Sequence, residues 1–433
     1  MGSILFTAFL ALLIWGLLFS NELQRRQPQW HWRLVGYPLT ALRIVLTWRR
    51  VAYLNGLAVS HKPNRRVLGD LEVKGEPLRT LTPRISFPRA TPYGLEVRVR
   101  LHAGQTPAPF LASSDAFAHA WRVHTVRVVS PERGVVLITA TARDPLKHTD
   151  HTAAPGTAAL LSATVGTLES GRSWGMNFRR VPHWLIVGAT QSGKSTLLAR
   201  LVTELAPQPV ALVGIDCKGG MELGLLEMRL SALATCRSEA VTVLVALVTE
   251  MQDRMRACRF AGARSIWELP EKGRPVPVVV IVDELAELYL TNGSKEQRAE
   301  AEECTTYLLR LAQLGAALGM HLVVAGQRVG SDLGPGVTAL RAQLSGRICH
   351  RVNDPGTAEM ALGDLNKDAV AVAQSIGEAE RGVAVTTGDM GGWMRGRSHL
   401  TTPAEARAAA AEFARMTPRP KFLAGTPGGG TLV

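Results

Sequence analysis

Residues 188–195 read Gly-Ala-Thr-Gln-Ser-Gly-Lys-Ser, and they have the residue types and spacing of a phosphate-binding loop. An apolar run at 184–187 precedes them and a helix-forming sequence follows from Thr196. Glycines let backbone N–H groups wrap a phosphate, and the start of a helix adds a positive dipole end. We therefore predict that Lys194 contacts the β- and γ-phosphates of ATP and that the Ser195 hydroxyl holds Mg²⁺. The predicted nucleotide-contacting residues are Gly188, Ala189, Thr190, Gln191, Ser192, Gly193, Lys194, Ser195 and Thr196.

Two acidic residues follow a second apolar run, at 276–282. The first, Asp283, is placed to hold Mg²⁺ through water, and Glu284 is placed to act as the general base that polarises an attacking water. A solvated carboxylate at a helix start is the alternative for Glu284. Gln327 follows a third apolar run, at 321–325, where a polar side chain can sense the γ-phosphate. From its local pattern alone, a turn residue is the slightly favoured explanation of Gln327.

From 182 to 402 the sequence alternates between short apolar runs and helical stretches, which predicts an α/β domain with a parallel sheet buried on both faces. Before it, Leu95, Val97, Val99 and Leu101 alternate with polar residues, as in a half-buried strand. The predicted organisation lists six parts in order: a membrane anchor at 1–54, a linker at 55–80, a small α+β domain at 81–150, a connection at 151–181, the α/β domain at 182–402, and a helical, Pro/Gly-rich tail at 403–433.

The N-terminus carries an uncharged apolar run, which we interpret as a membrane span over about residues 4–20. A cleaved signal and a buried helix are the alternatives, but no Lys or Arg precedes the run, as a signal peptide would require. Arg25, Arg26 and Arg33 follow the run, so the positive-inside rule puts the rest of the chain in the cytoplasm.

A second apolar stretch, residues 34–54, is interrupted by arginines. Arg43 and Arg50 are seven residues apart and would share one helical face. This pattern favours a helix that lies on the membrane surface over one that crosses it, with a two-span hairpin as the alternative.

The composition bears on possible partners. The 433-residue chain has 49 Lys+Arg against 36 Asp+Glu and a formal net charge of +13, which suits a polyanionic partner such as nucleic acid or anionic lipid. Hydrophobic residues make up 46% of it, which excludes a wholly disordered chain. The five cysteines are too far apart for a zinc ribbon or a disulfide scaffold.

Taken together, four segments resemble the FtsK/SpoIIIE family of membrane-anchored DNA translocases. They are PHWLIVGATQSGKST (182–196), LVGIDCKGG (212–220), VPVVVIVDELAEL (276–288) and RLAQLGAALGMHLVVAGQR (310–328). The last is the most specific match, and it favours the sensor role for Gln327. The resemblance implies a RecA-like P-loop motor, a homo-hexameric ring with ATP bound between subunits, and double-stranded DNA in the central pore.

The sequence also departs from the family pattern. Leu314-Gly315-Ala316 stands where the family often has a basic residue, so an arginine that acts on the neighbouring subunit's ATP must lie elsewhere. Arg310, Arg341 and Arg347 are the candidates, and we favour Arg347 because it follows an apparent helix. With one motor and a short N-terminal region, the layout is most similar to the transfer (Tra) proteins of actinomycete conjugative plasmids and integrative elements.

The sequence therefore predicts a membrane-anchored, ATP-driven translocase of double-stranded DNA that serves conjugative transfer between cells. The predicted catalytic residues are Lys194, Glu284, Gln327 and Arg347. Three alternatives remain: a chromosome-segregation translocase, a protein-export ATPase of the type VII secretion kind, and a nucleotide-binding scaffold that does not turn over. Type VII ATPases usually carry several motors in tandem, whereas this chain has one phosphate loop, and the Asp283-Glu284 pair argues against a scaffold.

Overall fold

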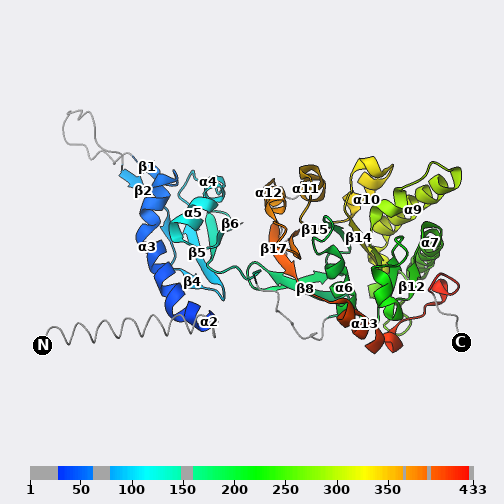
Figure 1. The fold of residues 1–433 in the computed structure, drawn as a ribbon. Helices are drawn as coiled ribbons and strands as arrows, with labels where there is room; N and C mark the ends of the chain where they lie inside the picture. The colour runs from blue at the N-terminus through cyan, green and yellow to red at the C-terminus, as the bar shows by residue number, and fades with distance from the viewer. Residues whose placement is uncertain (1–27, 62–78, 148–158, 364–366, 388–391, 429–433) are drawn as a thin grey trace, which may run out of the picture. The chain divides into compact units, whose positions relative to one another are not determined.

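The computed structural model describes residues 28–61, 79–147, 159–363, 367–387 and 392–428, which belong to two compact units, Met1–Pro145 and Leu146–Val433 (Figure 1). The predicted span at 4–20 lies outside the described residues. Within the described ranges, every helix is too short or too polar to cross a membrane.

In the first unit, a long N-terminal helix packs on a small antiparallel sheet. Helix α2 (Pro28–His31) runs through one π-helical turn (Trp32–Gly36) into α3 (Tyr37–Leu54). The following elements are listed in chain order: β1 (Val59–His61), β2 (Arg79–Leu81), β3 (Arg84–Ile85), β4 (Arg89–Ala90), β5 (Gly94–Arg100), α4 (Ala108–Ala112), α5 (Ser114–Trp121), β6 (Thr125–Glu132) and β7 (Val135–Thr141). Strands β3, β5, β7 and β6 pair in that order, β4 pairs with β5, and β1 pairs with β2.

Helix α3 belongs to the core of this unit, which corrects the prediction that residues 34–54 form a membrane-surface segment separate from the small domain. Its inner face buries Ile44 and Trp48 in the same cluster as Val97 and Phe117. The Trp48 indole N–H donates to the Pro83 carbonyl at 2.7 Å. This packing makes residues 34–54 a structural part of the domain and leaves no free helix there for a second crossing.

The second unit is built on a mixed sheet, in which the described part of the chain contributes ten strands in the order β12-β11-β13-β14-β10-β15-β16-β17-β8-β9. Their bounds, in chain order, are β8 (Ser162–Leu168), β9 (Ser173–Asn177), β10 (His183–Val187), β11 (Ala211–Ile215), β12 (Ala232–Ala234), β13 (Val278–Val282), β14 (Met320–Gly326), β15 (Gly346–His350), β16 (Val383–Thr387) and β17 (Trp393–Ser398). The pairs from β12 to β15 are parallel, as the buried apolar runs predict.

The remaining strands of this sheet are antiparallel, which the sequence did not predict. Strand β17 pairs with β8, so residues 162–177, which we interpreted as an irregular connection, are part of the mixed sheet. A register shift between Thr164 and Gly166 interrupts the alternation of β8 and hides its strand pattern.

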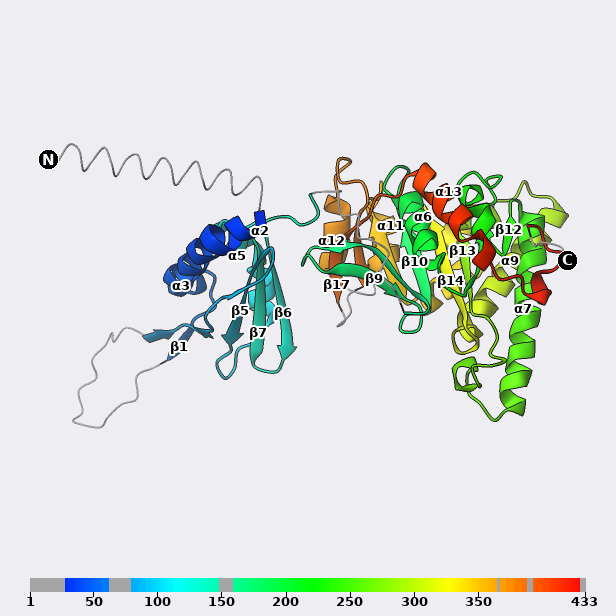
Figure 2. The ribbon, with the colours of Figure 1, turned by 90° about the horizontal axis from the view of Figure 1, so that it is seen from below.

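Helices cover both faces of the mixed sheet (Figure 2). They are, in chain order, α6 (Lys194–Leu205), α7 (Arg237–Phe260), α8 (Leu285–Tyr289), α9 (Lys295–Leu314), α10 (Val337–Gln343), α11 (Pro355–Leu362), α12 (Lys367–Ser375) and α13 (Pro403–Glu412). Side chains of α7, α9 and α10 share one buried cluster with Val187 and Val282, whereas those of α6 and α13 share a second one with Ile186 and Ile281. Alternate residues of the same strands thus enter opposite cores, which is why these runs are apolar throughout.

Burial lowers the pKa of three histidines in this unit, that of His183 and His350 to about 4 and that of His321 to about 3. In the unfolded chain the pKa is about 6.5, so the unfolded state binds protons that the folded state excludes. The free energy of unfolding should therefore fall as the pH drops below about 6.5, by up to about 1.4 kcal/mol per pH unit for each histidine. Denaturant unfolding between about pH 7.5 and about pH 5 measures this slope.

Two variants test whether the buried histidines cause this pH dependence of the free energy of unfolding. His321→Leu removes one buried imidazole and should flatten the pH dependence, whereas His119→Gln, at an exposed position, should leave it unchanged. Equal slopes for His321→Leu and the unchanged protein would contradict the interpretation.

Candidate active site

The predicted phosphate loop occupies the turn between the end of β10 at Val187 and the start of α6 at Lys194. It is fixed by the ends of the neighbouring strands: the Ala189 N–H donates to the Arg351 carbonyl, and the Gly382 N–H donates to the Ser192 carbonyl, each at 2.8 Å. The loop therefore lies at the carboxyl edge of the parallel strands, where ligands of open α/β sheets bind.

One glycine of the loop is required by both conformation and space. Gly193 has φ +113°, a conformation that L-residues rarely adopt. A Cβ at this position would lie 2.6 Å from the backbone N and Cα of Gly382. Any larger residue would push the loop away from Gly382, which directly precedes β16. The glycine of the motif is therefore required by the tertiary packing as well as by the close approach of the backbone to a phosphate.

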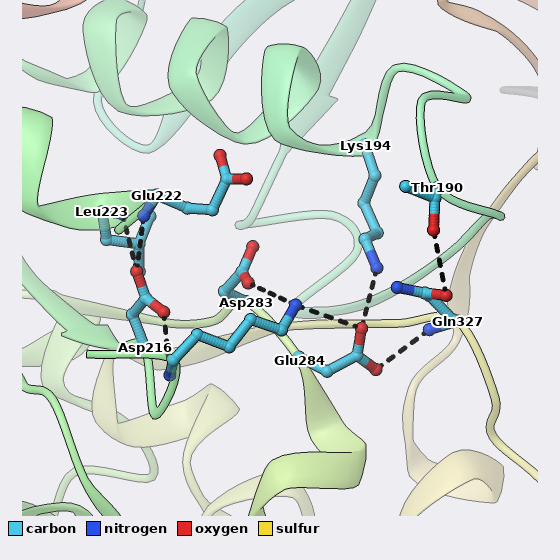
Figure 3. A network of polar contacts seen from close by, with 9 residues as sticks. Thr190, Lys194, Asp216, Glu222, Leu223, Asp283, Glu284 and Gln327 are labelled. Atoms are coloured by element: carbon cyan, nitrogen blue, oxygen red, sulfur yellow. Dashed lines mark hydrogen bonds and ion pairs between the residues drawn. The ribbon is translucent and has the colours of Figure 1, made fainter. Parts of the chain in front are cut away.

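Two lysines and two carboxylates meet at the centre of the site (Figure 3). The Lys194 Nζ lies 3.2 Å from Glu284 Oε2, and the Lys218 Nζ lies 3.3 Å from Asp283 Oδ2. Burial raises the pKa of Asp283, and the charge of Lys218 opposes this shift. The four charges balance, which makes their burial tolerable because each ion has a partner of opposite sign.

Gln327 joins the same network. Its backbone N–H donates to Glu284 Oε1 at 3.0 Å, and its side-chain Oε1 accepts a hydrogen bond from the Thr190 hydroxyl at 3.4 Å. The structure thus places this glutamine between the candidate base and the phosphate loop (Figure 3). A γ-phosphate sensor needs contact with both, and the sensor role stays a prediction.

The residues predicted to hold Mg²⁺ fit a magnesium site. Ser195 and Asp283 line the same cavity. Asp283 Oδ1 is buried and has no hydrogen-bond partner among the described residues. No group of three or more His, Cys, Asp or Glu side chains in the described ranges is arranged to hold a metal. A hydroxyl, one carboxylate and phosphate oxygens match the preference of Mg²⁺ for few protein ligands alongside water and phosphate.

The phosphate loop opens into a cavity of about 650 Å³ that also has a wall from the antiparallel part of the sheet. The lining residues that the sequence reasoning missed are Lys218, Glu222, Ala379, Arg381, Gly382, Arg397, Ser398 and Leu400. Arg381 donates to the Gln191 side-chain oxygen at 3.2 Å, and Arg397 donates to the Arg381 carbonyl at 3.0 Å. No local signal marks this wall, since it follows the phosphate loop by about 190 residues. Lys218 did carry a signal, as part of the quoted segment 212–220.

The structure does not bring Arg347 to the site. It lies within β15, its side chain is 94% buried (6% exposed), and its guanidinium donates to the Arg341 carbonyl at 2.8 Å. An arginine that acts on a neighbouring subunit must be exposed, so the preference for Arg347 was wrong. Arg341 donates to the Val329 carbonyl at 3.0 Å and is half-buried, whereas Arg310 on α9 is exposed. Of the three candidates, only Arg310 is exposed.

The fold and the site define a P-loop ATPase motor. Residues 158–331 match the FtsK/SpoIIIE family, and residues 20–142 match the actinomycete conjugal transfer protein N-terminal domain. The transfer protein TraSA of Streptomyces ambofaciens is 40% identical over 394 residues, which cover 88% of this chain and 94% of that protein. The chain belongs to the FtsK/SpoIIIE family and is a Tra-like P-loop ATPase of the DNA-translocase type.

Two solved structures have the same fold. The pCW3 conjugation coupling protein TcpA, in its monomer form with ATPγS, is similar with a TM-score of 0.53 and 21% identity, over 75% of this chain and 93% of that one. The cytoplasmic domain of the Thermomonospora curvata type VII secretion ATPase EccC is similar with a TM-score of 0.50 and 21% identity, over 65% of this chain and 34% of that one. At these identities the likeness concerns the fold alone.

Two substitutions should separate binding from hydrolysis. Lys194→Ala should abolish productive ATP binding because it removes the charge that neutralises the phosphates. Glu284→Gln should keep binding and lower turnover by about 100-fold or more, because the amide cannot accept the proton of water. Equilibrium ATP binding and phosphate release, measured on the same preparations, distinguish the two defects.

The control for the acidic position is Glu296→Gln, which makes the same chemical change at an exposed residue in the first turn of α9. It should behave like the unchanged protein. Near-normal turnover by Glu284→Gln would show that Glu284 is not the base.

Proposed function

We propose that the protein is a membrane-attached, ATP-driven translocase of double-stranded DNA that acts as a homo-hexamer in DNA transfer between cells. The main support for this function is that the similarity to the transfer protein TraSA extends across both units and is not confined to the motor. A chromosome-segregation role has less support, because the relatives named DNA translocase FtsK are similar over only about half of this chain. The likeness to EccC is one of fold, so it gives no specific support to protein export.

The chemistry of the site supports a motor over a static scaffold. Glu284 contacts both Lys194 and the Gln327 backbone. Lys194 and Gln327 line one cavity together with Ser195 and Asp283, the proposed Mg²⁺ ligands. The net charge of +13 suits a phosphate backbone as the track. A translocase must close around its track, and repeated head-to-tail contacts between identical subunits can close into a ring. The exposed Arg310 on α9 is then the candidate for contact with the neighbour's ATP.

Helix α3 supports attachment to the membrane. The face opposite the core carries Leu39, Leu42, Leu46 and Tyr53, which are 56–72% exposed. Their spacing of three, four and seven residues places them in one stripe. The exposed arginines 49 and 50 lie beside this stripe, as on a helix that contacts anionic lipid. In this proposal residues 4–20 anchor the chain, the outward face of α3 rests on the membrane, and the motor lies in the cytoplasm.

Double-stranded DNA should stimulate ATP turnover. Binding through phosphates should tolerate any sequence and weaken steeply with salt, because each contact releases counterions. Phosphate release is measured with and without linear duplex DNA at increasing salt, with Lys194→Ala as the inactive control. An ATP turnover rate that does not change when duplex DNA is added at low salt would exclude the translocase function. Protein export would then be the alternative.

Removal of residues 1–27 should leave only the α3 contact, so high salt should release the protein from membranes without detergent, while ATP turnover persists. The cut must precede Pro28, because α3 supplies buried core residues to the first unit. Fractionation with and without detergent measures the release. A full-length chain that stays soluble without detergent would refute the anchor.

The α3 face is tested separately on the truncated protein with anionic vesicles. Leu42→Glu combined with Leu46→Glu should lower vesicle binding, because two charges enter the apolar stripe. Phe87→Glu, at a 73% exposed position of the same unit, is the control and should leave binding unchanged. Equal binding by both variants would refute the α3 contact and leave the anchor at 4–20 untouched.

A further inference from the structure

The loop after β11 is held in a fixed shape by one buried carboxylate. Asp216 is fully buried, and its side chain accepts the backbone N–H groups of Glu222 at 2.8 Å, Leu223 at 2.9 Å and Lys218 at 3.3 Å. Gly219 and Gly220 complete the turn at φ +75° and +74°. Figure 3 shows Asp216 closing this loop beside the site. The backbone of Lys218 is therefore anchored where its side chain can reach the cavity.

From this anchored position the Lys218 ammonium contacts both acids. Its Nζ lies 3.3 Å from Asp283 Oδ2 and 3.5 Å from Glu284 Oε2. The same Glu284 Oε2 is 3.2 Å from the Lys194 Nζ. Two ammonium groups thus share one carboxylate oxygen of the candidate base.

The two lysines differ in the contacts that they make when ATP is bound. Lys194 belongs to the phosphate loop, and its charge is required at the β- and γ-phosphates when ATP is bound. Glu284 then loses that partner just when it must face a water molecule, beside a second carboxylate that repels it. Lys218 is not part of the phosphate loop, so it can keep its contacts with Asp283 and Glu284 while Lys194 serves the nucleotide.

We infer that Lys218 is a positioning residue for hydrolysis: it holds Asp283 and Glu284 side by side once Lys194 has transferred to the phosphates. The loop closed by Asp216 is the support that makes this position rigid. Lys218 then acts through the two carboxylates and not on the nucleotide. The inference rests on the ATPase site itself and does not require that DNA is the track.

A direct phosphate contact by Lys218 is the competing explanation, because its side chain is 34% exposed and lines the cavity. The two explanations differ in what they do to binding. A phosphate ligand stabilises bound ATP and the transition state alike, so its loss weakens affinity. A positioning residue affects the transition state, so its loss lowers kcat and leaves the dissociation constant nearly unchanged.

The test compares Lys218→Met, which removes the charge and keeps most of the chain length, with Lys218→Arg, which keeps the charge. In the full-length protein, Lys218→Met should lower kcat about 10- to 100-fold, the cost of a base that is misplaced by about an ångström. The dissociation constants of ATP and ADP, measured with Mg²⁺ present, should stay within about threefold. Lys218→Arg should restore part of kcat, and Lys272→Met, at an exposed loop lysine, should change neither quantity.

An unchanged kcat in Lys218→Met would overturn the inference, and so would a loss of ATP affinity as large as the loss of kcat/KM. A Lys218→Arg variant as inactive as Lys218→Met would also count against it. If Lys218→Met does not fold, Lys218→Gln allows the same comparison. Turnover is recorded without and with duplex DNA, so a failure of DNA stimulation would refute the proposed function while the Lys218 comparison stands.

Discussion

The contact between Lys194 and Glu284 is the interaction on which the rest of the site depends. It joins the phosphate loop after β10 to the acidic pair after β13, two strands that are separated in the sheet by β14. A buried ammonium or carboxylate without a partner would cost several kcal/mol, so both side chains can be buried here because each has a partner of opposite sign. Gln327, after β14, completes the bridge through its backbone N–H.

The order of the parallel strands explains why these residues meet. Strands β11, β13, β14 and β10 are neighbours, and each supplies its polar group from the segment that follows its carboxyl end. Lys218, the Asp283–Glu284 pair, Gln327 and Lys194 therefore come together although up to 133 positions separate them (327 − 194). Parallel strands with crossover helices place equivalent ends on one edge, and this geometry alone assembles the site.

The antiparallel strands do more than extend the sheet of the motor, because they also form one wall of the nucleotide cavity. Strands β16 and β17 bring Arg381 and Arg397 to the cavity, and β8 covers the outer side of β17. The tight approach of Gly193 to Gly382 shows how closely the phosphate loop fits against this wall. Residues 162–177 are thus needed for the sheet that supports the nucleotide cavity, even though they carry no chemistry themselves.

Helix α3 shows a similar double use in the first unit. One face provides Ile44 and Trp48 to the core, and the other carries exposed leucines. A contiguous exposed apolar stripe is typical of a contact surface, so this face of α3 calls for a further contact. The arginines beside the stripe favour an anionic lipid surface over a second copy of this basic chain.

The sequence by itself determined the chemistry and the parallel core. The phosphate loop, Asp283, Glu284 and Gln327 could be found because each is adjacent to an apolar strand in sequence, and such local patterns survive without knowledge of the fold. It also predicted the small α+β domain from the alternation of 95–101. The other features of the fold depend on contacts between segments that are distant in the sequence. Only the tertiary structure decided these.

Strand β8 pairs with β17 over a separation of about 230 residues, and no local pattern encodes such a partner. The exposure of an arginine is equally a property of the packed fold: Arg347 has the residue type of a trans-acting arginine, yet it is buried within β15. Helix α3 was separated from the small domain because its sequence shows which residues are apolar but not which segment they contact. Spacing fixes which side chains share a helix face or a strand face, but burial depends on which other segment covers that face, and that is decided only when the chain folds.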